Sequence, residues 1–88
     1  MKKYIVIELD RGMTCPTLVN RSYEGEYSYS NKAKALAKAK MYKCESKNRK
    51  ANMVYAVVTS DFCFEKYHWD GQTFPKVNKE DCIYLVEW

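Results

Sequence analysis

The chain has 88 residues, 47% of them hydrophobic and 15% aromatic, and a formal net charge of +4 at pH 7. A chain of this size forms one domain around one core, and its apolar content is too high for a disordered protein. No run approaches the ~20 apolar residues that cross a bilayer. The first residues are basic, but the apolar segment that follows them is broken by Glu8 and Asp10, which is not the pattern of a signal peptide. We therefore expect one domain over residues 1–88, a cytoplasmic location and no membrane partner.

The basic residues are concentrated in one segment. Residues 31–50 hold eight basic residues and a single acid, Glu45, which is a net charge of +7. The rest of the chain holds seven basic and ten acidic residues, a net charge of −3. Such an asymmetry is typical of proteins that bind polyanions.

The first half of the chain predicts strands followed by one helix. Residues 3–9 are apolar on both faces at first, as in a central strand. Residues 17–19 and 23–29 have the character of edge strands. Ser30 is a suitable N-cap for a helix over residues 31–47, which is rich in Ala and Lys. At about 100° per residue, the side of this helix expected to meet the sheet carries Ala33, Leu36, Ala37, Met41 and Cys44.

The second half predicts further strands. Residues 52–60 form the clearest strand, and residues 62–69 alternate as a strand would. Asp70-Gly71 is a hairpin signal that leads into a short edge strand at residues 73–74. Residues 82–88 form the last strand. The expected fold is α+β, a small antiparallel sheet of about four to five strands with one basic helix packed on one face.

The basic helix and its exit loop are the first candidate site. Their cations can neutralise phosphates of RNA or another polyanion, and we expect RNA rather than DNA. Lysines bind phosphates as point charges rather than read bases, so sequence-specific reading of duplex DNA is the least expected variant. A purely solvated helix is the alternative, but such helices usually mix Glu with Lys at i, i+4 spacing. The expected nucleic-acid contacts are Lys32, Lys34, Lys38, Lys40, Lys43, Lys47, Arg49 and Lys50, with Tyr42 as a possible stacking platform.

Catalysis, metals and cofactors find little support. His68 is the sole histidine, and a general-base role would need Glu65 or Asp61 as a partner; on a strand, Glu65 points to the opposite face. We expect no catalytic residue, no metal and no cofactor. The cysteines are too widely spaced for a zinc site, and we expect buried or half-buried free thiols at Cys15, Cys44, Cys63 and Cys82.

An aromatic surface is the second candidate site. As a strand, residues 62–69 would place Phe62 and Phe64 on one face and Tyr67 and Trp69 on the other. One helix cannot cover both faces, so one group is either covered by loops or available to a partner, including a second copy of the chain. The alternative function is therefore a protein–protein inhibitor that binds through Tyr67, Trp69 and Phe74.

The order of elements resembles that of small phage-encoded counter-defence proteins, either antitoxins or anti-CRISPR proteins. The resemblance lies in a short opening strand at residues 3–7, a Ser-capped Ala/Lys helix over residues 30–43 and a hairpin over residues 54–69. It implies a non-enzymatic inhibitor in the host-cell cytoplasm. The resemblance leaves the target unnamed, and it leaves open whether the lysines contact RNA or an acidic protein surface. Our preferred hypothesis is an inhibitor of an RNA-handling host defence enzyme.

Overall fold

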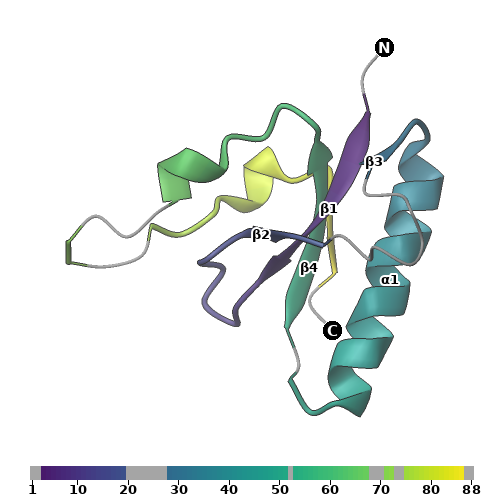
Figure 1. Ribbon diagram of the computed structural model, residues 1–88, viewed down its shortest axis with the longest axis horizontal. Helices are drawn as coiled ribbons and strands as arrows, with labels where there is room; N and C mark the ends of the chain where they lie inside the picture. Colours follow the sequence, from purple (N-terminus) through teal and green to yellow (C-terminus); the bar gives the residue numbers. More distant parts are fainter. Residues whose placement is uncertain (1–2, 20–27, 52, 68–70, 73–74, 87–88) are drawn as a thin grey trace.

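The computed structural model describes residues 3–19, 28–51, 53–67, 71–72 and 75–86. The fold is α+β, as predicted: within these residues the chain forms a five-stranded antiparallel sheet and one α-helix (Figure 1). The elements in chain order are β1 (Tyr4–Leu9), β2 (Thr17–Leu18), β3 (Ser28–Tyr29), α1 (Lys32–Asn48), β4 (Val54–Thr59), the 3₁₀ helices η1 (Phe64–Tyr67) and η2 (Lys79–Asp81), and β5 (Tyr84–Val86).

β1 and β4 form the centre of the sheet. They pair antiparallel along their full length, from Tyr4 opposite Thr59 to Leu9 opposite Val54. Both strands are rich in Ile and Val, which favour the pleated backbone, and both are buried on their two faces. β5 flanks β4 on the outer side, which confirms the prediction of a strand near the end of the chain.

β2 and β3 lie along the same outer side of β1 and together form one interrupted edge. The Val19 N–H donates to the Val6 carbonyl, and Ser28 is the residue opposite Ile5, so the edge resumes at the next position of β1. Eight residues, 20–27, separate Val19 from Ser28 in the sequence. The predicted edge strand at 17–19 is confirmed; that at 23–29 is confirmed only for β3, since residues 20–27 lie outside the described part of the chain.

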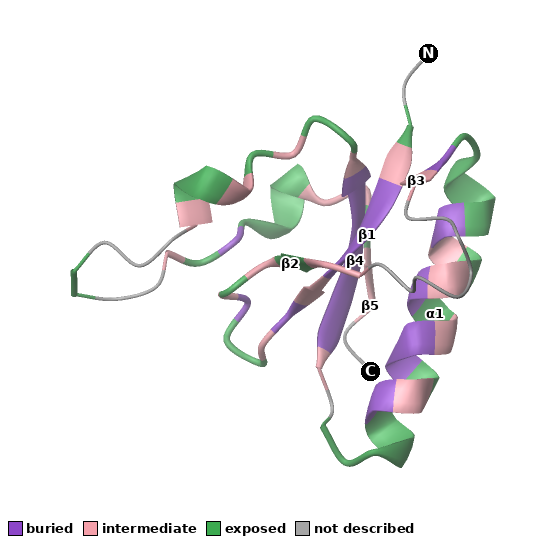
Figure 2. Ribbon diagram, viewed as in Figure 1, coloured by how far each residue is buried: buried purple, intermediate pink, exposed green. Residues whose placement is uncertain are grey.

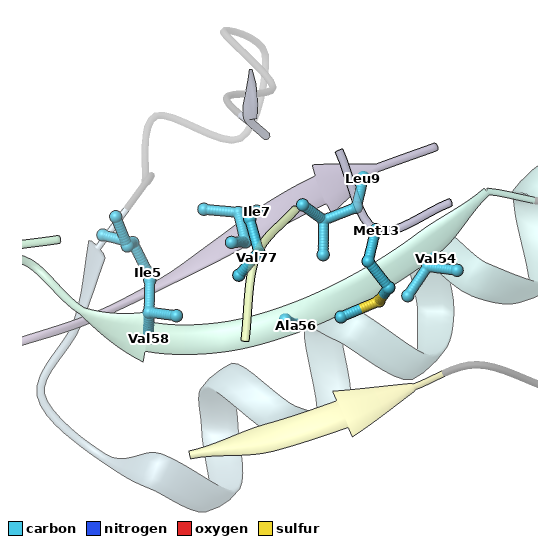
Figure 3. Packing of buried hydrophobic residues seen from close by; sticks show 8 residues of the cluster. All are labelled: Ile5, Ile7, Leu9, Met13, Val54, Ala56, Val58 and Val77. Atoms are coloured by element: carbon cyan, nitrogen blue, oxygen red, sulfur yellow. The ribbon is translucent and has the colours of Figure 1, made fainter. Parts of the chain in front are cut away.

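The sheet is covered on both faces, so the molecule has three layers (Figures 1 and 2). α1 covers one face, where Ala35, Ala39 and Tyr42 pack with Val6 and Val57. The chain after β4 covers the opposite face. There, Val77 and the loop residue Met13 join Ile5, Ile7, Leu9, Val54, Ala56 and Val58 (Figure 3).

The segment after β4 corrects a prediction. The described part of the predicted strand, residues 62–67, does not form a strand, because residues 64–67 form the 3₁₀ helix η1; residues 68–69 lie outside the described part of the chain. Phe62 stacks on Tyr67 with ring centroids 5.4 Å apart and meets Phe64 edge-on at 5.0 Å. Positions three residues apart share a side of a 3₁₀ helix, so Phe64 and Tyr67 both pack against the core. α1 therefore covers one face of the sheet and the segment after β4 covers the other. This differs from the expectation that a strand at residues 62–69 would leave one group of aromatic residues without cover from the helix.

The predicted hairpin falls mostly outside the described residues. Asp70, Thr73 and Phe74 are among the residues not described, and Gly71 is a bend with φ of 101°, a conformation that favours glycine.

Candidate nucleic-acid interface

α1 begins one residue later than the sequence suggests. The N-cap is Asn31 rather than Ser30: the Asn31 Oδ1 accepts a hydrogen bond of 2.7 Å from the Ala33 N–H. This bond satisfies one of the free amides of the first turn, and Asn serves that purpose as well as Ser. The first turn contains no acidic residue, so Lys32 and Lys34 make the start of the helix basic.

The side of α1 that meets the sheet is the opposite of the predicted one. The buried residues Ala35, Ala39, Tyr42 and Ser46 follow the i, i+4, i+7, i+11 spacing of one helix face. The predicted face is turned to the solvent: Ala33, Ala37 and Cys44 are exposed, and Leu36 and Met41 are half-buried (Figure 2). The physical reason is that Ala occurs on both sides of the helix, and the larger buried residues are polar ones.

Two predicted contact residues are removed from the site by their burial. The Tyr42 ring is fully buried against Tyr55, with ring centroids 6.1 Å apart, so it offers no platform to a base. Lys43 is only 3% exposed, and its Nζ donates a 2.5 Å hydrogen bond to the Met53 carbonyl. Ser46 accepts from the Met53 N–H at 2.7 Å. Lys43 and Ser46 thus fix α1 to the residue that precedes β4, and Lys43 has a structural role.

The remaining cations define what we call the basic face. Lys38 is half-buried at the edge of this face. Lys32 lies with its Nζ 5.9 Å from the centre of the Tyr4 ring, a cation–π distance that draws it toward the sheet. The exposed members of the basic face are Lys32, Lys34, Lys40, Lys47, Arg49 and Lys50.

The end of α1 is a Schellman motif that carries three of these cations. The Ala51 N–H donates to the Ser46 carbonyl and the Lys50 N–H to the Lys47 carbonyl. Lys50 occupies the left-handed position, with φ of 61°, where glycine is usual. Cations at this end also interact favourably with the free carbonyls of the last turn, and the Arg49 Nε lies 3.4 Å from the Glu45 carbonyl.

A buried polar cluster lies beneath this end of the helix. The Tyr55 hydroxyl donates a 2.6 Å hydrogen bond to Glu8 Oε2. Burial and this carboxylate raise the pKa of Tyr55 to about 12, against the opposing effect of Ser46 and Arg49. Burial also lowers the pKa of Lys43, and the charges of Lys47 and Arg11 lower it further. Arg11, in the exposed turn after β1, is therefore a further cation near this end of α1.

The aromatic candidate site is only partly described. Tyr67 is half-buried, stacks on Phe62, and donates a 3.3 Å hydrogen bond to Asp81 Oδ2, so it is used inside the protein. Trp69, Phe74 and His68 lie outside the described residues. In the described ranges, Tyr84 on β5 is the one large exposed hydrophobic residue, at 37%.

The cysteines are free thiols, and the prediction that all are at least half-buried is wrong. Cys15, Cys44 and Cys63 are exposed, and Cys82 is half-buried. Cys44 lies on the outer side of α1, whereas Cys63 lies in the opposite layer. Across the described segments, no group of three potential His, Cys, Asp or Glu ligands could hold a metal ion.

Comparisons with protein-family models, with curated proteins and with solved structures found no match. Within the described ranges, α1 is the one α-helix, and no helix has the length and apolar character needed to cross a bilayer.

Proposed function

We propose that the protein is a non-enzymatic RNA-binding protein whose contact surface is the basic face of α1. The observation that carries the proposal is the exposure of six cations on one helix and its exit turn, with Glu45 as the sole acid in residues 31–50. A helix of 17 residues extends for roughly 25 Å, so these cations can reach several consecutive phosphates. Lysines at i, i+4 spacing repel each other and cost stability, which an anionic ligand would offset.

Charge reversal tests the proposal. The Lys34→Glu, Lys40→Glu double variant changes two exposed positions of the basic face. If about two phosphate contacts are lost, the slope of log K against log salt on single-stranded RNA becomes less steep by about 1.4. The matched control is Lys66→Glu, Lys76→Glu, which makes the same charge change at exposed positions in the opposite layer. Equal loss of affinity in both double variants would mean that net charge, not the basic face, drives binding.

Thiol protection gives a second test without charge changes. Cys44 is exposed on the side of α1 that carries the cations, and Cys63 is exposed in the opposite layer. Bound RNA should slow alkylation of Cys44 and leave that of Cys63 unchanged, as measured by mass spectrometry after brief iodoacetamide treatment. Protection of Cys63 alone would move the contact to the other layer.

The resemblance to phage counter-defence proteins adds a setting to this proposal, namely inhibition of an RNA-handling host enzyme. The basic face would then compete for the enzyme's RNA or occupy its RNA channel. An inhibition assay with the same two double variants tests this setting: inhibition should be lost with Lys34→Glu, Lys40→Glu and retained with the control. Inhibition that survives in both would favour the alternative protein contact near Tyr67.

A further inference from the structure

The cations of α1 lie in two rows rather than in one. At about 100° per residue, Lys32, Lys40 and Lys47 lie on one flank of the helix. Lys34 and the half-buried Lys38 lie on the other flank, more than about 100° away around the axis, and the half-buried Glu45 shares this second flank. The buried side, with Ala35, Ala39, Tyr42 and Ser46, lies opposite the gap between the rows.

The outer surface between the two rows carries mainly short side chains; Asn48 is exposed at its end, and Met41, beside Lys34, is half-buried. Ala33, Ala37 and Cys44 are exposed there. The lysine side chains are longer than these residues, so their amino groups extend beyond the surface between the rows. One ligand can therefore contact both rows at once.

Among the described residues, the basic face has no exposed aromatic ring on which a base of a single strand could stack. Proteins that bind single-stranded RNA combine cations with exposed aromatic rings. Tyr42, the aromatic residue of α1, is fully buried, and the large exposed hydrophobic residue of the described segments, Tyr84, is on β5 rather than on the helix. Arg49 is the one arginine among the exposed cations of this face, so base reading through guanidinium forks is also limited.

From these observations we infer that the ligand is double-stranded RNA, bound with α1 across its minor groove and with the two lysine rows on the phosphates of the two strands. This inference rests on the proposed function. The A-form minor groove is wide and shallow and is recognised by shape and by phosphate contacts. α1 packs on the sheet along one side, so only its outer half is available to contact a nucleic acid. This geometry suits a shallow groove better than the major groove of B-DNA, which is roughly 8.5 Å deep.

The experiment compares one mixed-sequence 20-mer as duplex RNA, as each single RNA strand and as duplex DNA, by fluorescence anisotropy over a salt series. We expect duplex RNA to bind at least about tenfold more tightly than either alternative. The double variant Lys40→Gln, Lys47→Gln removes two cations from one row, and Lys34→Gln removes one cation from the other. Each should reduce the preference for duplex RNA. The pair Lys66→Gln, Lys76→Gln is the control.

A bulky residue between the rows gives a test with no change of charge. Ala37 is exposed, so Ala37→Trp should lower the melting temperature by only a few degrees, because Trp is a weaker helix former than Ala, yet it should hold duplex RNA away and weaken its binding by about tenfold. Single-stranded RNA should bind this variant no more weakly, because the new ring can stack on a base.

The possible outcomes separate the two proposals. If single strands bind as tightly as the duplex and depend on the same lysines, the duplex inference fails and the proposed function stands. If duplex DNA binds as tightly as duplex RNA, the choice of the RNA minor groove is wrong. If no nucleic acid binds at low salt, both proposals fail.

Discussion

At the scale of single residues, the contacts at the end of α1 separate the cations that build the fold from those left to bind a ligand. Lys43 donates a hydrogen bond to the Met53 carbonyl, and Ser46 accepts one from the Met53 N–H. The Tyr55 hydroxyl donates to the Glu8 carboxylate. The neighbouring Lys47, Arg49 and Lys50 are exposed. Burial, not residue type, therefore decides which positive charges are available to a phosphate.

The Tyr55–Glu8 hydrogen bond makes a first prediction about stability. Tyr55→Phe removes a 2.6 Å bond to a carboxylate beneath the helix and should lower the free energy of unfolding by about 1–3 kcal/mol at pH 7. Urea unfolding followed by circular dichroism measures the loss. Tyr84→Phe, at an exposed ring, is the control and should leave the free energy unchanged at pH 7.

The same variant should show a characteristic pH dependence. The pKa of Tyr55 is about 12 in the folded protein and 10.0 as the ordinary value, so the folded state keeps a proton that the unfolded state loses. The stability that Tyr55 contributes is therefore fully present below pH 10 and is lost as the pH rises toward 12. The difference between wild type and Tyr55→Phe should narrow over that range; a constant difference would contradict the raised pKa.

At the scale of the elements, the Schellman motif of α1 predicts a stabilising substitution. Lys50 adopts a φ of 61°, which is unfavourable for a residue with a Cβ. Lys50→Gly should raise the free energy of unfolding by about 0.5–1 kcal/mol. Lys50→Ala is the control, because it loses the same charge but keeps the strain, and it should give no such gain. An equal gain in both variants would assign the effect to charge repulsion instead.

The elements also show where sequence patterns suffice and where they fail. β1 and β4 were predicted because runs of Ile and Val have few other stable environments in a small protein. The orientation of α1 was not predicted correctly, because its buried side consists of Ala, Tyr and Ser while its apolar residues are spread around the helix axis. The fact that Tyr42 is the largest side chain of the helix is the signal that could have identified the buried side.

The prediction for the segment after β4 was wrong for a different reason. Alternation of Phe62, Phe64 and Lys66 with other residues fits a strand, but Phe64 and Tyr67 fit the three-residue repeat of a 3₁₀ helix equally well. Only the contact with the sheet, where Phe62, Phe64 and Tyr67 join one cluster, decides between the two. Tertiary packing of this kind is not encoded in local spacing.

At the scale of the whole molecule, the layers separate the charges. The helix layer carries the net +7 of residues 31–50, and the rest of the chain is slightly acidic. The concentration of charge was evident from the sequence, but the burial of Lys43 and the exposure of the surface between the two rows follow from how α1 packs on the sheet. The candidate site was thus predicted as a segment and not as a surface.

This charge layout predicts that salt affects stability and binding in opposite directions. Lysines at positions 34 and 38 and at positions 43 and 47 are like charges at i, i+4, each pair costing about 0.2–0.5 kcal/mol. Raising NaCl from about 0.01 M to about 1 M shortens the screening length from about 30 Å to about 3 Å, which relieves that repulsion. The melting temperature should rise by a few degrees, while RNA affinity falls steeply over the same range.

Two single variants test whether salt stabilises the protein by screening repulsion within α1. Lys34→Gln removes the repulsion between Lys34 and Lys38 and takes a cation away from the first turn of α1, so it should raise the melting temperature at low salt and reduce the further gain at high salt. Lys66→Gln, in the opposite layer, should leave the salt response unchanged. A melting temperature that falls as salt rises would mean that attraction between the basic helix and the acidic remainder of the chain outweighs repulsion among the lysines. In that case the helix charges would stabilise the free protein, and the argument that repulsion favours an anionic ligand would no longer hold.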